Sequence, residues 1–234
     1  MRAPALLRTN RDFRLLWIGE SVSELGSTVT LVALPFVALI ALHATAFEVA
    51  ALAAAETIFW PFIALPIGVW VDRVSRRRVL LIADAGRALA LVSIPIAAAM
   101  HDLTLAQLYV VGVVAGVLTI FFAVAYPSYL PSVVTTDALV EGNSLLTGAE
   151  QVAHISGPAL GGALVQALGA ANALFADVAS FIVSVVAVFA IRADEPPPVT
   201  ERRKMRHEVV EGVRFLIEHK VLRAFIVSAA PSNL

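Results

Sequence analysis

The sequence predicts an all-α membrane protein with six transmembrane helices, and three observations support this fold class. The 234-residue chain has a mean hydropathy of +0.84 and is 59% hydrophobic. Only 15% of its residues are charged, whereas soluble domains carry about 25%. Its apolar residues gather in six runs, each near the roughly 20 residues that a helix needs to cross a bilayer.

The six runs are separated by short polar or proline-containing breaks such as "HATAF", "HDLT" and "LGAAN". The first run follows several arginines, as a signal peptide would, but its length and the spans that follow favour a true helix. The expected spans are residues 13–42, 47–71, 79–100, 105–130, 139–168 and 172–191.

Lysines and arginines are confined to alternate connections. All but Arg87 of the 17 lie before or at the start of the first run, between the second and third runs, or after the sixth. The positive-inside rule therefore predicts a multi-pass protein of the cell (inner) membrane, with the N-terminus, residues 72–78 and residues 193–222 in the cytoplasm.

The chain divides into three parts. Residues 1–192 form the predicted six-helix domain. Residues 193–222, which are rich in proline and charge, are expected to form a cytoplasmic loop that carries an amphipathic surface helix. Residues 223–234 are too short to cross a bilayer and are expected to be the start of a seventh helix.

Two similar stretches hint at an internal repeat. "LLIADAGRALALVS" begins the third run and "ALFADVASFIVSVV" begins the sixth, each with Ala-Asp near its start. The two stretches enter the membrane from opposite sides. This arrangement is typical of a 3+3 inverted repeat.

The stretch "GVWVDRVSRRRVL", residues 68–80, concentrates charge between two apolar runs. One interpretation is that its arginines only fix topology. Its spacing also resembles the loop signature of the major facilitator superfamily, G-x-x-x-D-R-x-G-R-R, with Ser75 in place of the second glycine. The matching residues are Gly68, Asp72, Arg73, Arg76 and Arg77.

The resemblance implies that this loop is a gate, in which Asp72 and Arg73 dock against a second half of the transporter and Arg76 and Arg77 support them. Asp84 and Arg87 lie three residues apart on the third helix. They are expected either to join this charge network or only to neutralise each other.

The fifth run contains "SGPALGG", in which Gly157, Pro158, Gly161 and Gly162 resemble the G-P-x-x-G-G end of a signature found in antiporters of this superfamily. The resemblance favours export over import. Gly157 and Gly161 also form a plain G-x-x-x-G pair, which many helices use for close packing.

Polar and small residues recur at helical spacing in three runs, and we expect these stripes to form the wall of a polar cavity. The stripes are Glu20, Glu24 and Ser27; Tyr109, Gly112, Gly116, Thr119, Ala123 and Tyr126; and Asn143, Thr147, Glu150 and His154, the last running into Gly157 and Gly161.

Five carboxylates within or near the runs are candidates for proton coupling, or alternatively for structural hydrogen bonds: Glu20, Glu24, Glu56, Glu150 and Asp177. Glu150 is the first candidate because His154, one helical turn on, could share its proton. The superfamily's fourth-helix arginine, often tied to coupling, is missing here, where Gly112 stands near its place.

The resemblance covers nearly the whole chain, and the first span is similar to the branch containing the enterobactin exporter and macrolide efflux proteins. It implies proton-driven efflux of a hydrophobic or amphipathic small molecule by alternating access. The implied partners are that substrate, protons, the lipid bilayer and a C-terminal six-helix half. The alternative is a transport-inactive fragment or a membrane assembly partner.

Other chemistry finds no support in the sequence. The chain has no cysteine, no Walker A loop and no H-E-x-x-H motif. Its five histidines are scattered, and its net charge of -1 gives no basis for nucleic-acid binding. We therefore expect neither an enzyme nor a metal or cofactor site.

Overall fold

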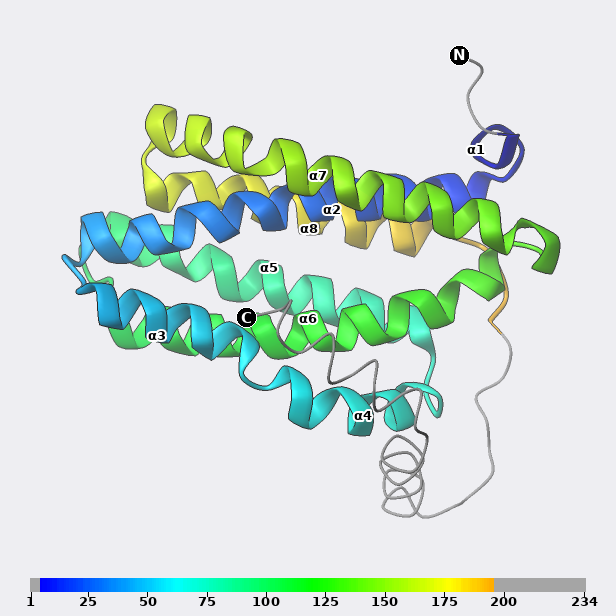
Figure 1. The fold of residues 1–234 in the computed structure, drawn as a ribbon, viewed down its shortest axis with the longest axis horizontal. Helices are drawn as coiled ribbons and strands as arrows, with labels where there is room; N and C mark the ends of the chain where they lie inside the picture. The colour runs from blue at the N-terminus through cyan, green and yellow to red at the C-terminus, as the bar shows by residue number, and fades with distance from the viewer. Residues whose placement is uncertain (1–4, 196–234) are drawn as a thin grey trace, which may run out of the picture.

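The computed structural model describes residues 5–195, and the secondary structure of this part of the chain is entirely helical (Figure 1). Its elements are α1 (Ala5–Thr9), α2 (Arg11–Phe36), a π-helical turn (Val37–Ala41), α3 (Ala46–Thr57), α4 (Trp60–Val71), α5 (Arg76–Met100), α6 (Leu105–Val133), a 3-10 turn (Thr136–Ala138), α7 (Leu139–Leu168) and α8 (Ala170–Ala190). The predicted surface helix and seventh helix lie outside the described residues.

Five helical segments between residues 5 and 195 are long and apolar enough to cross a membrane. They are Arg11–Ala41, Ala46–Val71, Arg76–Ala99, Leu105–Val133 and Ala170–Ala190. The chain is therefore a multi-pass membrane protein. α7 is 30 residues long and coincides with the predicted fifth span, but it carries more polar residues and is not among these five.

The predicted second span, residues 47–71, is confirmed as the apolar segment Ala46–Val71, but its helix is not continuous. The span is broken at Ile58 and Phe59, which form a turn between α3 and α4. Pro61, in the first turn of α4, fits the break, because proline has no N–H for the helical hydrogen bond and is tolerated in the first turn of a new helix.

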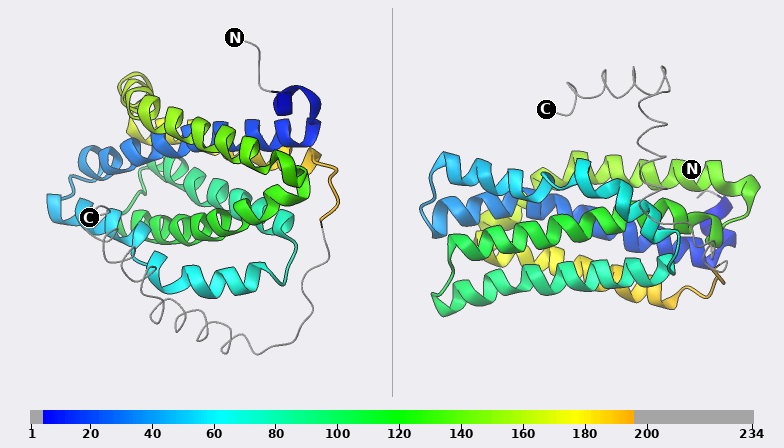
Figure 2. Two further views of the ribbon diagram at one scale, coloured as in Figure 1. Left: turned by 45° about the vertical axis from the view of Figure 1, so that its right-hand side comes forward. Right: turned by 90° about the horizontal axis from the view of Figure 1, so that it is seen from below.

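The helices form two layers, shown in Figures 1 and 2. α2 packs against α7 and α8 in one layer, and α6 packs against α3, α4 and α5 in the other. Contact between α5 and α8 joins the layers. We call the end of the bundle that holds residues 5–12, 72–78, 133–141 and 190–195 the arginine end.

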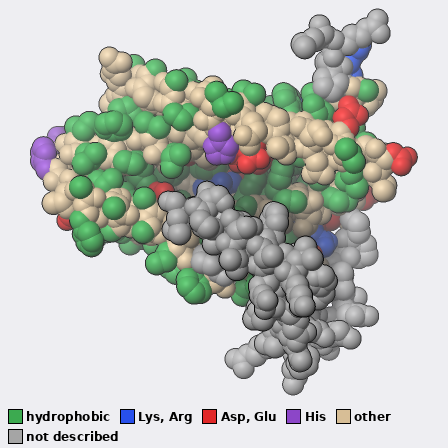
Figure 3. All heavy atoms as spheres, viewed as in Figure 1, with side chains coloured by type: hydrophobic (Ala, Val, Ile, Leu, Met, Phe, Trp, Pro, Cys, Tyr) green, Lys and Arg blue, Asp and Glu red, His purple; other side chains and the backbone are tan. Residues whose placement is uncertain are grey.

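Two apolar cores lie one above the other along the bundle. The core at the arginine end includes Phe13, Leu80 and Tyr129, and the core at the opposite end includes Leu34, Ile94 and Leu108. Buried polar residues of α2, α5 and α8 lie between the two cores. The face in Figure 3 is mostly hydrophobic, with charged side chains visible in a hollow near its middle.

Candidate functional site

A cavity of about 270 Å³ opens between α2, α6 and α7. We call it the carboxylate chamber, because Glu20, Glu24 and Glu150 line it. Its other lining residues are Arg87, Thr119, Phe122, Ala123, Tyr126, Pro127, Leu130, Asn143, Leu146 and Thr147. Members of the predicted stripes on three spans thus line one cavity: Glu20 and Glu24; Thr119, Ala123 and Tyr126; and Asn143, Thr147 and Glu150.

Five members of the predicted stripes do not line this chamber. Ser27 lines a different cavity, and Tyr109 donates its hydroxyl to the Glu48 carbonyl at 3.0 Å. Gly112 and Gly116 of α6 face α3 instead, where a Cβ at either position would touch or overlap Glu56. His154 is not among the lining residues, although its Nε2 lies 3.9 Å from Glu150 Oε1 and both side chains are about half exposed. The predicted pair therefore exists at the edge of the chamber.

A second cavity, of about 190 Å³, lies beside the break between α3 and α4. We call it the small chamber. Its lining includes Glu56, Asp177, Thr30 and Trp60. Asp177 is completely buried and accepts hydrogen bonds from Thr30 Oγ1 at 2.5 Å and from Ser180 Oγ at 2.9 Å. These contacts support a structural role for Asp177, which was the alternative to a role in proton coupling.

Arg87 of α5 lines both chambers. Its guanidinium forms an ion pair with the fully buried Asp84, and its side chain is only 6% exposed. The rings of Phe122 and Phe181 flank the guanidinium, with centroids 4.6 and 4.3 Å from its central carbon. Since Phe122 lines the carboxylate chamber and Phe181 the small chamber, these four side chains form a partition, which we call the Arg87 layer.

Of the two alternatives for Asp84 and Arg87, this geometry supports mutual neutralisation over joining the loop network. Within residues 5–195 their ion pair is with each other, in the interior of the bundle. Asp84 lies eight residues along α5 from Arg76, which is about 12 Å at the helical rise. The pair therefore belongs to the interior site.

The glycines of α7 show a packing role. A Cβ at Gly157 would overlap the side chain of Thr28 on α2, and one at Gly161 would approach Val29 and Val32. No atom lies within 4 Å of the corresponding position at Gly162. Gly157 and Gly161 thus allow α2 and α7 to approach closely. By helical spacing they continue the face of α7 that carries Asn143, Thr147 and Glu150.

The charged loop links three helices at the arginine end. Ser75 caps the N-terminus of α5 by accepting from the Arg78 N–H, and its hydroxyl donates to Glu195 at 2.6 Å. Glu195 also accepts the Arg76 N–H at 2.5 Å. Asp72, at the end of α4, accepts from Arg76 Nη2 at 3.2 Å. A carboxylate at a helix N-terminus is favoured by the helix dipole. Glu195 therefore holds the segment that follows α8 against the start of α5.

Arg77 makes the reciprocal contact at the C-terminus of α8. Its guanidinium donates to the carbonyl of Val188 at 3.2 Å and to that of Phe189 at 2.7 Å. These carbonyls belong to the last turn of α8, where helical N–H donors run out; that of Val188 also accepts the Ile191 N–H at 3.3 Å. α5 and α8 are therefore fastened together by Arg77 in one direction and by Glu195 in the other.

Replacing Glu195 with alanine is expected to lower the free energy of unfolding by about 1–2 kcal/mol, because the start of α5 loses its capping carboxylate. The melting temperature of the purified protein in detergent measures this effect. Asp194, its exposed neighbour, provides the matched control, Asp194→Ala, which should change little. Equal melting temperatures for wild type and Glu195→Ala would contradict the capping role.

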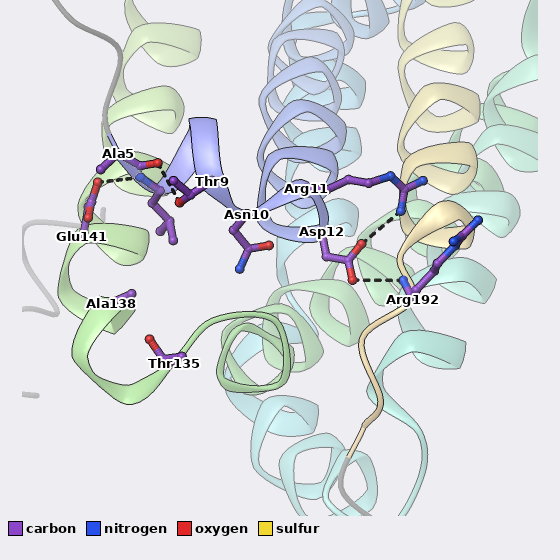
Figure 4. A pocket seen from close by; sticks show the side chains of 10 residues that line it. Ala5, Thr9, Asn10, Arg11, Asp12, Thr135, Ala138, Glu141 and Arg192 are labelled. Carbon is purple, nitrogen blue, oxygen red and sulfur yellow. Dashed lines mark hydrogen bonds and ion pairs between the residues drawn. The ribbon is translucent and has the colours of Figure 1, made fainter.

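A cavity of about 650 Å³ lies at the arginine end beside α1 (Figure 4). Its polar groups bond to one another or to nearby backbone: Glu141 accepts the Leu6 N–H, and Asp12 accepts from Arg11 and from the Arg192 N–H. Asn10 caps α2 and donates to the Val133 carbonyl. These contacts attach α1 to the bundle, and we assign the cavity a structural role.

Sequence reasoning missed several functional candidates. Glu195 had no signal because its role depends on α8 ending beside α5. Phe122 and Phe181 were indistinguishable from other apolar span residues. Thr30 lies one turn beyond the first stripe, at helical spacing from Ser27, and that spacing could have identified it. Among residues 5–195 no three His, Asp or Glu side chains form a group that could hold a metal ion.

Comparison with known proteins matches residues 3–233 to the transmembrane secretion effector family. The chain is similar to the multidrug efflux pump Tap of Mycolicibacterium fortuitum, with 28% identity over 86% of this chain and 51% of that protein. It is also similar to Tap of Mycobacterium tuberculosis strain H37Rv, at 27% identity over 89% of this chain and 52% of that protein. An uncharacterized MFS-type transporter of Bacillus subtilis, YfiS, is 24% identical over 96% of this chain and 54% of its own length.

The chain thus spans about half the length of these curated relatives. The family match, in contrast, covers almost all of the chain. It agrees with the apolar helices and with the signature residues of the loop after α4 and of α7. The chain belongs to the transmembrane secretion effector family of the major facilitator superfamily.

Proposed function

We propose that this chain forms one six-helix half of an exporter that moves a hydrophobic or amphipathic small molecule by alternating access, driven by protons. The carboxylate chamber carries the proposal, because charged residues within membrane spans usually face a bundle interior or an aqueous path. The relatives named as multidrug efflux pumps support the direction of transport. A second set of helices would complete the chamber wall.

We take α7 as the fifth span of this half, which together with the five apolar segments gives six. It lies alongside α2 and α8 in both figures of the bundle, and α2 packs against it closely. Much of its remaining surface is exposed, including Asn143, Thr147 and Glu150. A polar face of this kind is suited to a water-filled path or to a second half.

The helix contacts support an inverted 3+3 repeat. In such a repeat α2 corresponds to α6, α3–α4 to α7, and α5 to α8. The contacts follow this correspondence. α2 packs against α8 and α7, and α6 packs against their counterparts, α5 and α3–α4. Asp84 and Asp177 are both fully buried, and each bonds to the residue three positions on, Arg87 or Ser180. The Ala-Asp similarity in the sequence thus falls at equivalent positions.

The loop at residues 72–77 is the proposed cytoplasmic gate. Asp72 is exposed apart from its contact with Arg76, so it is accessible to a second half. Arg76 and Arg77 hold the loop to residues at the end of α8. In this arrangement the gate and α8 move together, while Asp72 forms and breaks the contact across the two halves.

The test is proton-gradient-driven uptake of a neutral dye, Nile red, and a cationic dye, ethidium, into inverted membrane vesicles. The protein is expressed with the helices that complete it. Asp72→Asn should reduce uptake several-fold without changing the amount of protein in the membrane. Glu150→Gln should reduce the dependence of uptake on the pH gradient. Asp102→Asn, which changes an exposed carboxylate at the other end of α5, is the control.

Wild-type vesicles that take up neither dye would count against an exporter and favour a membrane assembly partner. Normal uptake by Asp72→Asn would remove Asp72 from the gate. Uptake by Glu150→Gln with an unaltered pH dependence would remove Glu150 from the proton path.

A further inference from the structure

The carboxylate chamber contains acidic groups that have no partner in this part of the chain. Glu20 Oε2 and Tyr126 Oη are both buried and accept or donate no hydrogen bond among the described residues. Glu24 likewise forms no hydrogen bond or ion pair there. Polar groups removed from water are costly when they stay unpaired, so this chamber has unused capacity to bind a ligand.

The positively charged side chain that lines the chamber with these carboxylates already has an ion-pair partner outside the chamber. Among the residues that the structure describes, Arg87 is the one lysine or arginine that lines the chamber. Its guanidinium is paired with Asp84 and packed between two phenylalanine rings. His154 approaches Glu150 only at the exposed edge. The carboxylates Glu20, Glu24 and Glu150 therefore outnumber the positive charge available to them.

The other walls of the chamber are apolar or aromatic. The rings of Phe122 and Tyr126 are stacked with centroids 5.6 Å apart, and Pro127, Leu130 and Leu146 complete this side. An aromatic face attracts an organic cation as well as an apolar body. The chamber thus combines negative charge, aromatic faces and hydrophobic surface.

We propose that the carboxylate chamber selects lipophilic organic cations, and that the Arg87 layer stops them from passing into the small chamber. Glu20 and Glu24 supply the negative charge, and Phe122 and Tyr126 contact the apolar body. The Arg87 layer, which lies between the two chambers, fixes the depth of binding. This inference rests on the proposed function in one respect: it assumes that the exported substrate binds in the carboxylate chamber.

The experiment compares two ions of the same shape and opposite charge, tetraphenylphosphonium and tetraphenylborate. Binding to the purified chain in uncharged detergent micelles is measured by equilibrium dialysis, with binding to empty micelles subtracted. Tetraphenylphosphonium is expected to bind at least about tenfold more tightly than tetraphenylborate, since each carboxylate attracts the one and repels the other. Equal binding of the two ions would overturn the proposal without the need for any variant.

Charge-removing variants then locate the site. Glu20→Gln and Glu24→Gln should each weaken tetraphenylphosphonium binding by about tenfold, whereas the exposed-site control Asp102→Asn should bind as wild type does. Circular dichroism and size-exclusion chromatography confirm folding of each variant. Unchanged affinity in both folded glutamine variants would overturn the assignment. If one variant does not fold, the other decides the result.

The two proposals fail in distinguishable ways. Uptake of Nile red together with equal binding of the two ions would leave the exporter in place and remove the selection of cations. Selective binding of tetraphenylphosphonium by a protein that takes up neither dye would leave the cation site in place and remove the transport function.

Discussion

Replacing Asp84 with alanine is expected to lower the free energy of unfolding by about 3–5 kcal/mol, the cost of leaving one member of a buried ion pair without its partner. Asp84 is fully buried, and the guanidinium that it neutralises is 6% exposed. The flanking rings of Phe122 and Phe181 offer attraction to Arg87 but no countercharge. Unfolding in increasing sodium dodecyl sulfate, followed by circular dichroism, measures the loss.

A double-mutant cycle separates the pair from the rest of the layer. Arg87→Met should also be strongly destabilising, because it leaves Asp84 unpaired. The double variant Asp84→Ala and Arg87→Met removes both charges, so it should be more stable than the sum of the single losses predicts. Additive losses would contradict a strong interaction between the two side chains.

The positions of the spans could be predicted from the sequence for a simple physical reason. A bilayer requires apolar runs of a certain length, and every backbone group in them must be bonded within a helix. The expected fifth span coincides with α7, and the other boundaries differ by a few residues. The break in the second span was not predicted, because proline within a span often bends a helix without ending it.

The interior site was predictable only in part. Helical spacing correctly brought the polar stripes of three spans to one cavity, since residues three or four apart share a face. Spacing could not distinguish the cavity face of α6 from the face that packs on α3, because glycine and threonine suit either. Nor could it reveal the Arg87 layer, which is assembled from α5, α6 and α8 and depends on how the two layers of helices are joined.

Gly116→Ala should be the most disruptive of the small substitutions in α6. A methyl group at this position would overlap the backbone carbonyl of Glu56, and backbone cannot move aside as a flexible side chain can. Overpacking of this kind costs about 1–3 kcal/mol or more, and here it presses on the last turn of α3. We expect the lower unfolding midpoint in sodium dodecyl sulfate to be accompanied by rearrangement of the small chamber, which Glu56 and Gly116 both line.

Gly148→Ala in α7 is the matched control, because no atom lies within 4 Å of the position that its methyl group would occupy. Alanine is favoured over glycine within a helix by about 1 kcal/mol, so this variant should raise the unfolding midpoint. The same chemical change is thus expected to have opposite signs at the two sites. A fall of similar size in both variants would show that glycine serves flexibility in these helices, whereas opposite shifts would show that Gly116 is required by the close approach of α6 to the end of α3.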